Sequence, residues 1–272
     1  MPAKNHHYVP IFYQKGFAQA DQMLWRYDRR LREYKNLHPI VNCVEQDLYA
    51  VRAADGTWDR RIESDVLSPI DGAAATVIRN LTPGTALTRR QVRELVMFIG
   101  LQHTRLPSFG RAVRQIAEAT MNEWMRMRFG TLERAEGALE QYEHETGIRL
   151  IDAASMMNAV VNKRINARAN EKVFIEHMFK MANELALRLE HSGWTILVAP
   201  DATAFTVCDD PFVPVPPQGA VLTGMGFGRA VPPNTTVGGF LMMTKPTSTP
   251  PISFLEFYVA EILRAAQNIV PR

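Results

Sequence analysis

The sequence predicts an α+β fold: a small antiparallel sheet built from N-terminal and C-terminal strands, with a central helical block between them in the chain. Short strand-like runs separated by turns occupy residues 1–58. Apolar residues then recur at three- and four-residue intervals through residues 60–192, which is the period of an α-helix. Strand-like runs return in residues 194–270, followed by one more helix. This order of strands, helices and strands is typical of α+β proteins.

Length and composition predict a well-packed globular chain. Its 272 residues are 46% hydrophobic and 22% charged, which is enough to bury a substantial core. The length fits one large domain or two unequal ones, and we expect a single domain over residues 1–272. Basic and acidic residues number 31 and 28, giving a net charge of +3. This near balance does not indicate nucleic-acid binding by overall charge.

Cysteine content and hydropathy predict a cytoplasmic protein without a membrane anchor. Cys43 and Cys208 are too few for a disulfide framework and form no CxxC pair, so a reducing compartment is the default. The N-terminus lacks the charged and apolar regions of a secretion signal. No apolar run approaches the ~20 residues that span a bilayer.

The first quarter of the chain is expected to form a small antiparallel sheet. Between Met23 and Lys35, apolar residues lie on either side of a charged centre at residues 28–30, which predicts a β-hairpin. After a break at Pro39, the run DLYAV at residues 47–51 predicts a third short strand.

The helical block begins near residue 61. Apolar residues share one helical face over residues 61–81, and Pro69 is expected to kink or split that helix. Thr88 and Gln91 form a capping-box pattern before a strongly apolar run, so a long helix is expected to begin there and to end or bend near residues 106–107. Further helices are expected over residues 110–128, 131–146, 153–161 and 173–191.

The last section of the chain returns to strand-like runs. Residues 195–200 and 204–208 are rich in β-branched and aromatic side chains and predict an antiparallel hairpin. Residues 211–236 are rich in proline and glycine and predict a long irregular connection. One more strand is expected over residues 238–245, and an amphipathic helix over residues 253–269.

Two adjacent histidines and a tyrosine stand almost at the N-terminus, in the stretch HHYVP. Neutral histidine suits metal binding and general acid–base work, and Tyr8 beside them can position a proton or an anion. The competing interpretation, which the residues alone favour, is a tail whose aromatic side chains anchor the terminus. Adjacent strand residues point to opposite sides, so at most one of His6 and His7 is expected to face a given site.

Two polar residues continue the apolar face of the long helix. Leu95, Ile99 and Gln102 share that face, and Arg105 extends it. A buried unpaired charge costs several kcal/mol, so Arg105 needs a partner. An arginine suits a bidentate grip on carboxylate or phosphate. Alternatively, the face surfaces at the helix end and Arg105 pairs with an internal acidic group; both interpretations stay open.

The stretch CDDP follows a predicted strand. Asp209 and Asp210 are adjacent acids that can bind a hard cation or share one proton, which makes a divalent metal the candidate cofactor. Aspartate before proline is also common turn chemistry, and the spacing alone favours a turn. Cys208 has no activating base near it in the sequence.

Taken together, HHYVPIFYQKGF, LQHTRLP and FTVCDDPF resemble the signatures of a bacterial family catalogued as domain-of-unknown-function family 4238. By this resemblance, the HHYVP-type motif corresponds to His6, His7, Tyr8 and Pro10, the Q-x-x-R-x-P motif to Gln102, Arg105 and Pro107, and the S-D-N-P motif to Asp209 and Pro211. Cys208 stands where serine is usual, and Asp210 where asparagine is usual. Three separate motifs of histidine, arginine and aspartate are the residue types of one polar site.

The first functional hypothesis is a hydrolase that acts on a phosphate-containing substrate, nuclease-like and serving bacterial defence. Its expected partner is a nucleic acid or nucleotide. Arg105 would hold the phosphate, and a cation would sit on Asp209. The assigned catalytic residues are His6, His7 and Asp209, and the assigned substrate-binding residues are Tyr8, Gln102, Arg105 and Asp210.

The alternative hypothesis is a non-catalytic module that binds a protein or senses a small molecule. In this hypothesis the motif residues form a buried structural cluster, and each substitution would leave a partner unsatisfied. A protein partner would dock on the glutamate-rich helix expected over residues 131–146. For a sensor, the segment at residues 211–236 would be the lid.

Overall fold

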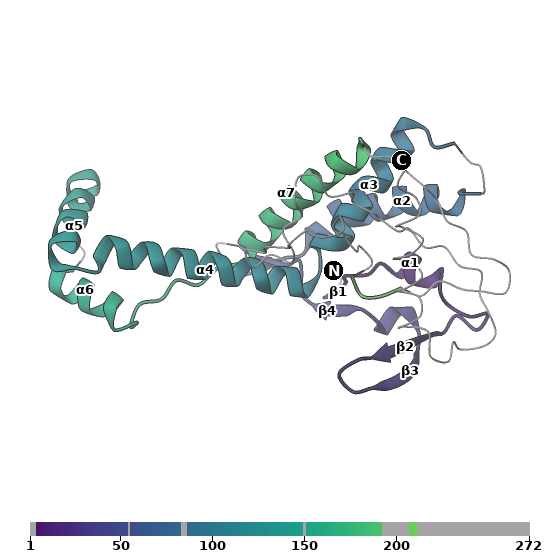
Figure 1. The fold of residues 1–272 in the computed structure, drawn as a ribbon, viewed down its shortest axis with the longest axis horizontal. Coiled ribbons are helices and arrows are strands. Elements are labelled where there is room, and N and C mark those ends of the chain that lie inside the picture. The colour runs from purple at the N-terminus through teal and green to yellow at the C-terminus, as the bar shows by residue number, and fades with distance from the viewer. Residues whose placement is uncertain (1–3, 54, 83–85, 149–150, 192–206, 211–272) are drawn as a thin grey trace, which may run out of the picture. The chain divides into compact units, whose positions relative to one another are not determined.

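The computed structural model describes residues 4–53, 55–82, 86–148, 151–191 and 207–210 (Figure 1). The α+β class is confirmed. The C-terminal strands and terminal helix expected after residue 194 lie outside the described residues, apart from 207–210. In chain order the elements are β1 (Asn5–His7), α1 (Ile11–Lys15), β2 (Leu24–Asp28), β3 (Glu33–Leu37), η1 (Pro39–Val41), β4 (Val44–Gln46), β5 (Val51–Arg52), β6 (Trp58–Asp59), η2 (Ile62–Leu67), α2 (Ser68–Arg79), α3 (Arg89–Thr104), α4 (Pro107–Phe129), α5 (Leu132–Thr146), α6 (Ala153–Val161) and α7 (Glu171–Glu190).

The chain divides into two compact units, which we name the hairpin unit and the helical unit. In the described residues, the hairpin unit is 11–42, and the helical unit comprises 4–10, 207–210 and the described part of 43–191. The single domain expected over residues 1–272 stays a prediction.

The hairpin unit contains the β-hairpin expected from the sequence. β2 pairs antiparallel with β3, from Leu24 opposite Leu37 to Asp28 opposite Glu33. In the turn, the Asp28 carboxylate accepts a hydrogen bond from the backbone N–H of Arg30 at 2.9 Å. Such side-chain bonding to the backbone explains why a charged centre lies between the two strands.

The helical unit begins with a short antiparallel pair of strands. β1 pairs antiparallel with β4, and His6 lies opposite Glu45. The prediction of a strand over residues 47–51 is wrong for the first four residues, which form a turn. The turn begins at Asp47, whose φ is 53°. Aspartate tolerates this left-handed conformation. An ion pair of 2.6 Å between Asp47 and Arg60 holds the turn.

The first helix of the block begins with a π-helical segment, η2, that continues into α2. The Ser68 N–H donates to the carbonyl of Glu63, five residues back. Pro69 follows at the junction between the two helix types. The wider π turn accommodates a residue that has no N–H to donate. The expected kink or split at Pro69 therefore takes the form of a change in helix type.

The other helix boundaries agree closely with the sequence pattern. Thr88 and Gln91 form the expected capping box at the start of α3. α5 ends at Gly147, whose φ of 69° suits glycine at a helix C-terminus. α4 starts at Pro107 rather than near Gly110, because proline in the first helical turn loses no hydrogen bond.

The core of the helical unit lies where α3 packs against α7. α2 also packs on α3, and the first half of α4 packs on α7 (Figure 1). At the closest approach of α3 and α7, a Cβ atom on Gly100 would lie 2.5 Å from the carbonyl oxygen of Ala182. Only glycine fits there. The central buried cluster is made by Leu48, Tyr49, Leu67, Leu101, Phe174, Ile175, Met178 and Ala182.

We expect Gly100→Ala to lower the free energy of unfolding by about 1–3 kcal/mol, because the added methyl group forces the backbones of α3 and α7 apart. Gly137→Ala on α5 is the matched control, since a Cβ there meets nothing within 4 Å. It should raise the stability by about 0.5–1 kcal/mol. Urea denaturation of both variants measures these changes, and equal stability of the two variants would contradict the packing described.

Candidate functional site

A cluster of buried polar side chains surrounds Arg105 at the C-terminal end of α3. Arg105 is only 1% exposed and is the largest fully buried side chain among the described residues. Burying a charge is costly unless it is paired. We call this group the Arg105 cluster; its members are His6, Tyr49, Glu63, Asp71, Gln102 and Arg105.

The guanidinium of Arg105 is engaged by two neighbours at its three nitrogens. Nη1 donates to both carboxylate oxygens of Asp71 at 3.1 Å. The Gln102 amide is oriented with its oxygen toward the guanidinium, where Oε1 accepts from Nε at 2.8 Å and from Nη2. The ring of Phe98 lies 5.7 Å from Cζ. In this structure, the partner of Arg105 is thus an internal acidic group.

Tyr49 connects His6 to Arg105. Its hydroxyl donates to the backbone carbonyl of Arg105 at 2.9 Å, and its backbone N–H donates to Nδ1 of His6 at 2.9 Å. The two rings stack with centroids 5.4 Å apart. Because Nδ1 accepts this bond, the neutral His6 ring carries its proton on Nε2. Burial raises the pKa of Tyr49 well above its ordinary value, which keeps the hydroxyl protonated as a donor.

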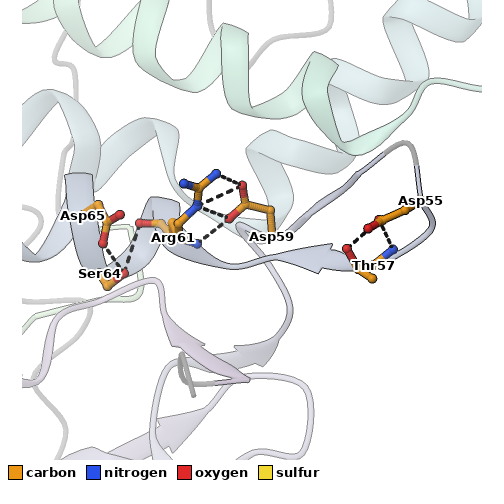
Figure 2. Close-up of polar contacts among 6 residues, drawn as sticks. All are labelled: Asp55, Thr57, Asp59, Arg61, Ser64 and Asp65. Carbon is orange, nitrogen blue, oxygen red and sulfur yellow. Dashed lines mark hydrogen bonds and ion pairs between the residues drawn. The ribbon is translucent and has the colours of Figure 1, made fainter.

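Exposed side-chain contacts fix the start of η2, on which Glu63 lies (Figure 2). The Asp59 carboxylate accepts from the backbone N–H of Arg61 at 3.0 Å and pairs with its guanidinium at 2.7 Å. The hydrogen bonds from the Arg61 side chain and backbone lower the pKa of Asp59 to about 2. Ser64 Oγ in turn donates to the Arg61 carbonyl. These exposed contacts therefore hold the residues on either side of Glu63 in place.

Glu63 is the most perturbed carboxyl group of the Arg105 cluster. Its Oε2 atom is buried and has no hydrogen-bond partner within the described residues. Burial raises the pKa of Glu63 to about 7, opposed by the charge of Arg105 and reinforced by that of Asp71. Burial likewise raises the pKa of Asp71, although Arg105 opposes that rise. Glu63 can therefore gain or lose a proton near neutral pH.

The rest of the HHYVP motif points elsewhere. Along β1, His6 is fully buried and His7 is half-buried, as alternation in a strand requires. Tyr8 packs against the central buried cluster, and its backbone N–H donates to the carbonyl of Cys43 at 3.0 Å. The roles assigned to His7 and Tyr8 in chemistry stay predictions.

The CDDP motif contacts α3 at His103, two residues before Arg105. Oδ1 of Asp210 lies 3.4 Å from Nδ1 of His103, and Cys208 Sγ donates to the Asp210 carbonyl. Asp209 is exposed, and among the described residues it makes no hydrogen bond or ion pair with His6 or Arg105. His6 and Arg105 are thus linked through Tyr49, whereas the CDDP motif contacts the LQHTRLP segment at His103 and not at Arg105.

Two further properties of the described part of the chain concern metal ligands and membrane-spanning helices. No group of three or more His, Cys, Asp and Glu side chains there is placed to hold a metal ion. None of the helices seen is long and apolar enough to cross a bilayer.

Three members of the Arg105 cluster were not expected from the sequence: Tyr49, Glu63 and Asp71. The sequence predicts a strand at Tyr49, whereas the structure places this residue in a turn that contacts His6 of β1. Glu63 and Asp71 lie at four-residue intervals from the buried Leu67, so both acids share its helical face. Acidic residues on the buried face of a helix were the available signal.

Comparison with known proteins identifies the family. The model of the family described as "Protein of unknown function (DUF4238)" matches residues 5–228, which span all three motifs. The chain belongs to the DUF4238 family. No curated protein and no solved structure matches it.

Glu63→Gln should change how stability depends on pH. The folded chain holds the Glu63 proton up to about pH 7, whereas an unfolded chain releases it near pH 4.5. The wild type therefore loses stability as pH rises between these values, by about 1–3 kcal/mol after allowance for partial solvent exposure. The variant lacks this ionisable group. Its free energy of unfolding should therefore fall less between pH 4.5 and pH 8 than that of the wild type. Parallel stability curves would refute the shift; Glu176→Gln on the exposed face of α7 is the control.

Proposed function

We propose that the chain is a non-catalytic protein-binding module, with the Arg105 cluster as a structural element and α5 as a docking surface. The state of Arg105 supports the structural role, because all three guanidinium nitrogens already bind Asp71 or Gln102. The state of His6 supports it as well, since its Nδ1 lone pair is used by the Tyr49 N–H.

The observation that carries the proposal is an acidic stripe along α5. The helix contains five glutamates and one arginine, and the four stripe residues recur at intervals of three and four, which puts them on one face. All four are exposed, and none has an ion-pair partner in the part of the chain that the structure describes. The stripe consists of Glu133, Glu136, Glu140 and Glu143.

This stripe costs the isolated helix stability. Like charges at i,i+3 and i,i+4 repel each other. Glu140 and Glu143 also stand near the C-terminal end of α5, where the helix dipole disfavours negative charge. A basic partner surface would offset both effects. We therefore infer a partner with a lysine- and arginine-rich face.

Reversing two charges of the stripe should weaken binding of a basic partner. The probe is a fluorescently labelled lysine- and arginine-rich helical peptide, titrated into the full chain and followed by anisotropy. Glu136→Lys/Glu140→Lys should weaken binding at least about tenfold, and binding by the wild type should weaken with added salt. Glu176→Lys/Glu184→Lys on α7 changes the net charge equally and should bind like the wild type. Equal loss in both double variants would refute a docking surface on α5.

A second candidate function is a hydrolase of a phosphate-containing substrate, nuclease-like and serving bacterial defence. The observation that favours it is Glu63, a carboxyl group with a pKa of about 7, which suits general acid–base catalysis. Its position on a π-helical segment adds support, since such segments are frequent at functional sites. The roles proposed for His7 and Asp209, and a nucleic acid or nucleotide as ligand, belong to this candidate.

Hydrolysis assays separate the two candidates. The full chain is incubated with single- and double-stranded DNA, with RNA and with a chromogenic phosphodiester, each with and without Mg²⁺ or Mn²⁺. A hydrolase should lose at least about 100-fold in rate on Glu63→Gln, and also on His7→Ala and Asp209→Ala, whereas Glu176→Gln should keep full rate. No hydrolysis by the wild type, or unchanged rates in Glu63→Gln, would rule out this candidate.

A further inference from the structure

The exposed face of the β2–β3 hairpin is aromatic. Residues along a strand alternate between its two faces, and Trp25 and Tyr27 of β2 share the exposed face with Tyr34 of β3. Their exposed fractions are 42%, 37% and 56%, whereas Leu24 on the other face is 8% exposed. An antiparallel sheet ordinarily keeps its solvated face polar. Three exposed rings on one hairpin therefore form a candidate binding surface.

The three rings lie close together along the hairpin. Tyr27 and Tyr34 are directly opposite each other in the ladder, with ring centroids 4.8 Å apart and planes inclined by 39°. Trp25 precedes Tyr27 by two residues on the same strand, which separates them by about 7 Å. It is opposite Asn36 and contacts no other aromatic ring among the described residues. The Trp25 ring is thus free of aromatic neighbours and can stack on a flat ligand.

The same hairpin concentrates positive charge. Residues 24–37 contain five basic and two acidic side chains, a net charge of +3 that equals that of the whole chain. Both acids are already engaged. Asp28 accepts from the backbone N–H groups of Arg30 and Leu31 at 2.9 and 3.2 Å, and Glu33 pairs with Lys35 at 2.6 Å. The bonds to Asp28 also fix the turn between the strands.

Three arginines, Arg29, Arg30 and Arg32, are exposed in that turn; we call them the turn arginines. None of them has an ion-pair partner in the part of the chain that the structure describes. The arginine guanidinium group matches the geometry of phosphate. Unpaired cations beside exposed aromatic rings are the combination that binds single-stranded nucleic acid, since the cations attract the phosphates and the rings stack on the bases.

We propose that the β2–β3 hairpin binds single-stranded nucleic acid, with bases stacked on Trp25, Tyr27 and Tyr34 and phosphates held by the turn arginines. A single strand fits better than a duplex, because only unpaired bases present their faces to side chains. An acidic protein would pair with the arginines but would leave the rings without a stacking partner. The inference rests neither on docking at α5 nor on hydrolysis at Glu63.

Fluorescence anisotropy with the full chain tests the proposal, in buffer with EDTA so that no divalent cation supports hydrolysis. The probes are labelled oligothymidylate and oligouridylate strands of about twelve nucleotides, a length within the site sizes of such proteins. Single strands should bind at least about tenfold more tightly than a DNA duplex of the same length. A preference for the uridine strand would identify RNA as the ligand, and the reverse preference DNA. Binding of neither strand, or equal binding of the duplex, would overturn the proposal.

Replacing Trp25 tests the stacking. Trp25→Thr should weaken binding of the preferred strand at least about fivefold, whereas Trp25→Phe keeps a ring and should bind nearly as the wild type does. Threonine suits a strand, and an unchanged circular dichroism spectrum checks that the variant is folded. Equal affinity of Trp25→Thr and the wild type would contradict stacking on this face. Trp25→Thr should still bind the basic peptide probe, which keeps the α5 proposal distinct.

Replacing the turn arginines by glutamine tests the phosphate contacts. Each phosphate contact to a single strand contributes about 0.7 to the slope of log affinity against log salt concentration, so the slope should become shallower by about 2. Trp25→Thr should leave the slope unchanged. The control removes three exposed arginines from the helical unit and should keep the wild-type slope: Arg111→Gln/Arg164→Gln/Arg168→Gln. Equal changes in the two triple variants would overturn the proposal, as would binding to phosphatidylserine vesicles without binding to either strand.

Discussion

The buried ion pair between Arg105 and Asp71 is the interaction on which the described helical unit depends. It joins the end of α3 to α2, and the same arginine receives the Tyr49 hydroxyl on its backbone carbonyl. Removing water from two charges costs several kcal/mol, which their attraction repays only when every remaining donor is satisfied. Here the Gln102 amide oxygen accepts hydrogen bonds from the two remaining guanidinium nitrogens, Nε and Nη2. The pair therefore requires α2, α3 and the turn after β4 to assemble together.

This constraint gives a physical reason for two of the family motifs to occur in one chain. The Q-x-x-R-x-P motif supplies Gln102 and Arg105, and the HHYVP motif supplies His6, whose Nδ1 accepts a hydrogen bond from the Tyr49 backbone. Tyr49 lies between them and belongs to neither motif. Within the Arg105 cluster, Glu63 is the member whose buried Oε2 atom has no hydrogen-bond partner among the described residues.

The sequence was informative where local chemistry decides the structure. The capping box at Thr88, the hairpin around Asp28 and the end of α5 at Gly147 follow from side chains within a few residues. The position of Tyr49 could not be predicted, because the run DLYAV at residues 47–51 suits a strand. In the structure, the backbone at Asp47 is left-handed and begins a turn. Glu63 and Asp71 were missed because the apolar pattern over residues 61–81 indicated a different helical face, whereas Leu67, midway between the two acids, is the buried residue. One of the two opening histidines was expected to share a site with Arg105 and Asp209. Tyr49 links His6 to Arg105, whereas Asp210 contacts His103.

A double-mutant cycle between Arg105 and Asp71 tests the central claim most directly. Urea denaturation gives the free energies of unfolding of the wild type, Arg105→Met, Asp71→Leu and the double variant. Each single change leaves one buried charge unpaired and should cost about 3–5 kcal/mol, whereas the double change replaces the pair by apolar groups and should cost much less than their sum. A coupling of at least about 1–3 kcal/mol is expected. Additive losses within about 0.5 kcal/mol would show that the helical unit does not depend on this pair.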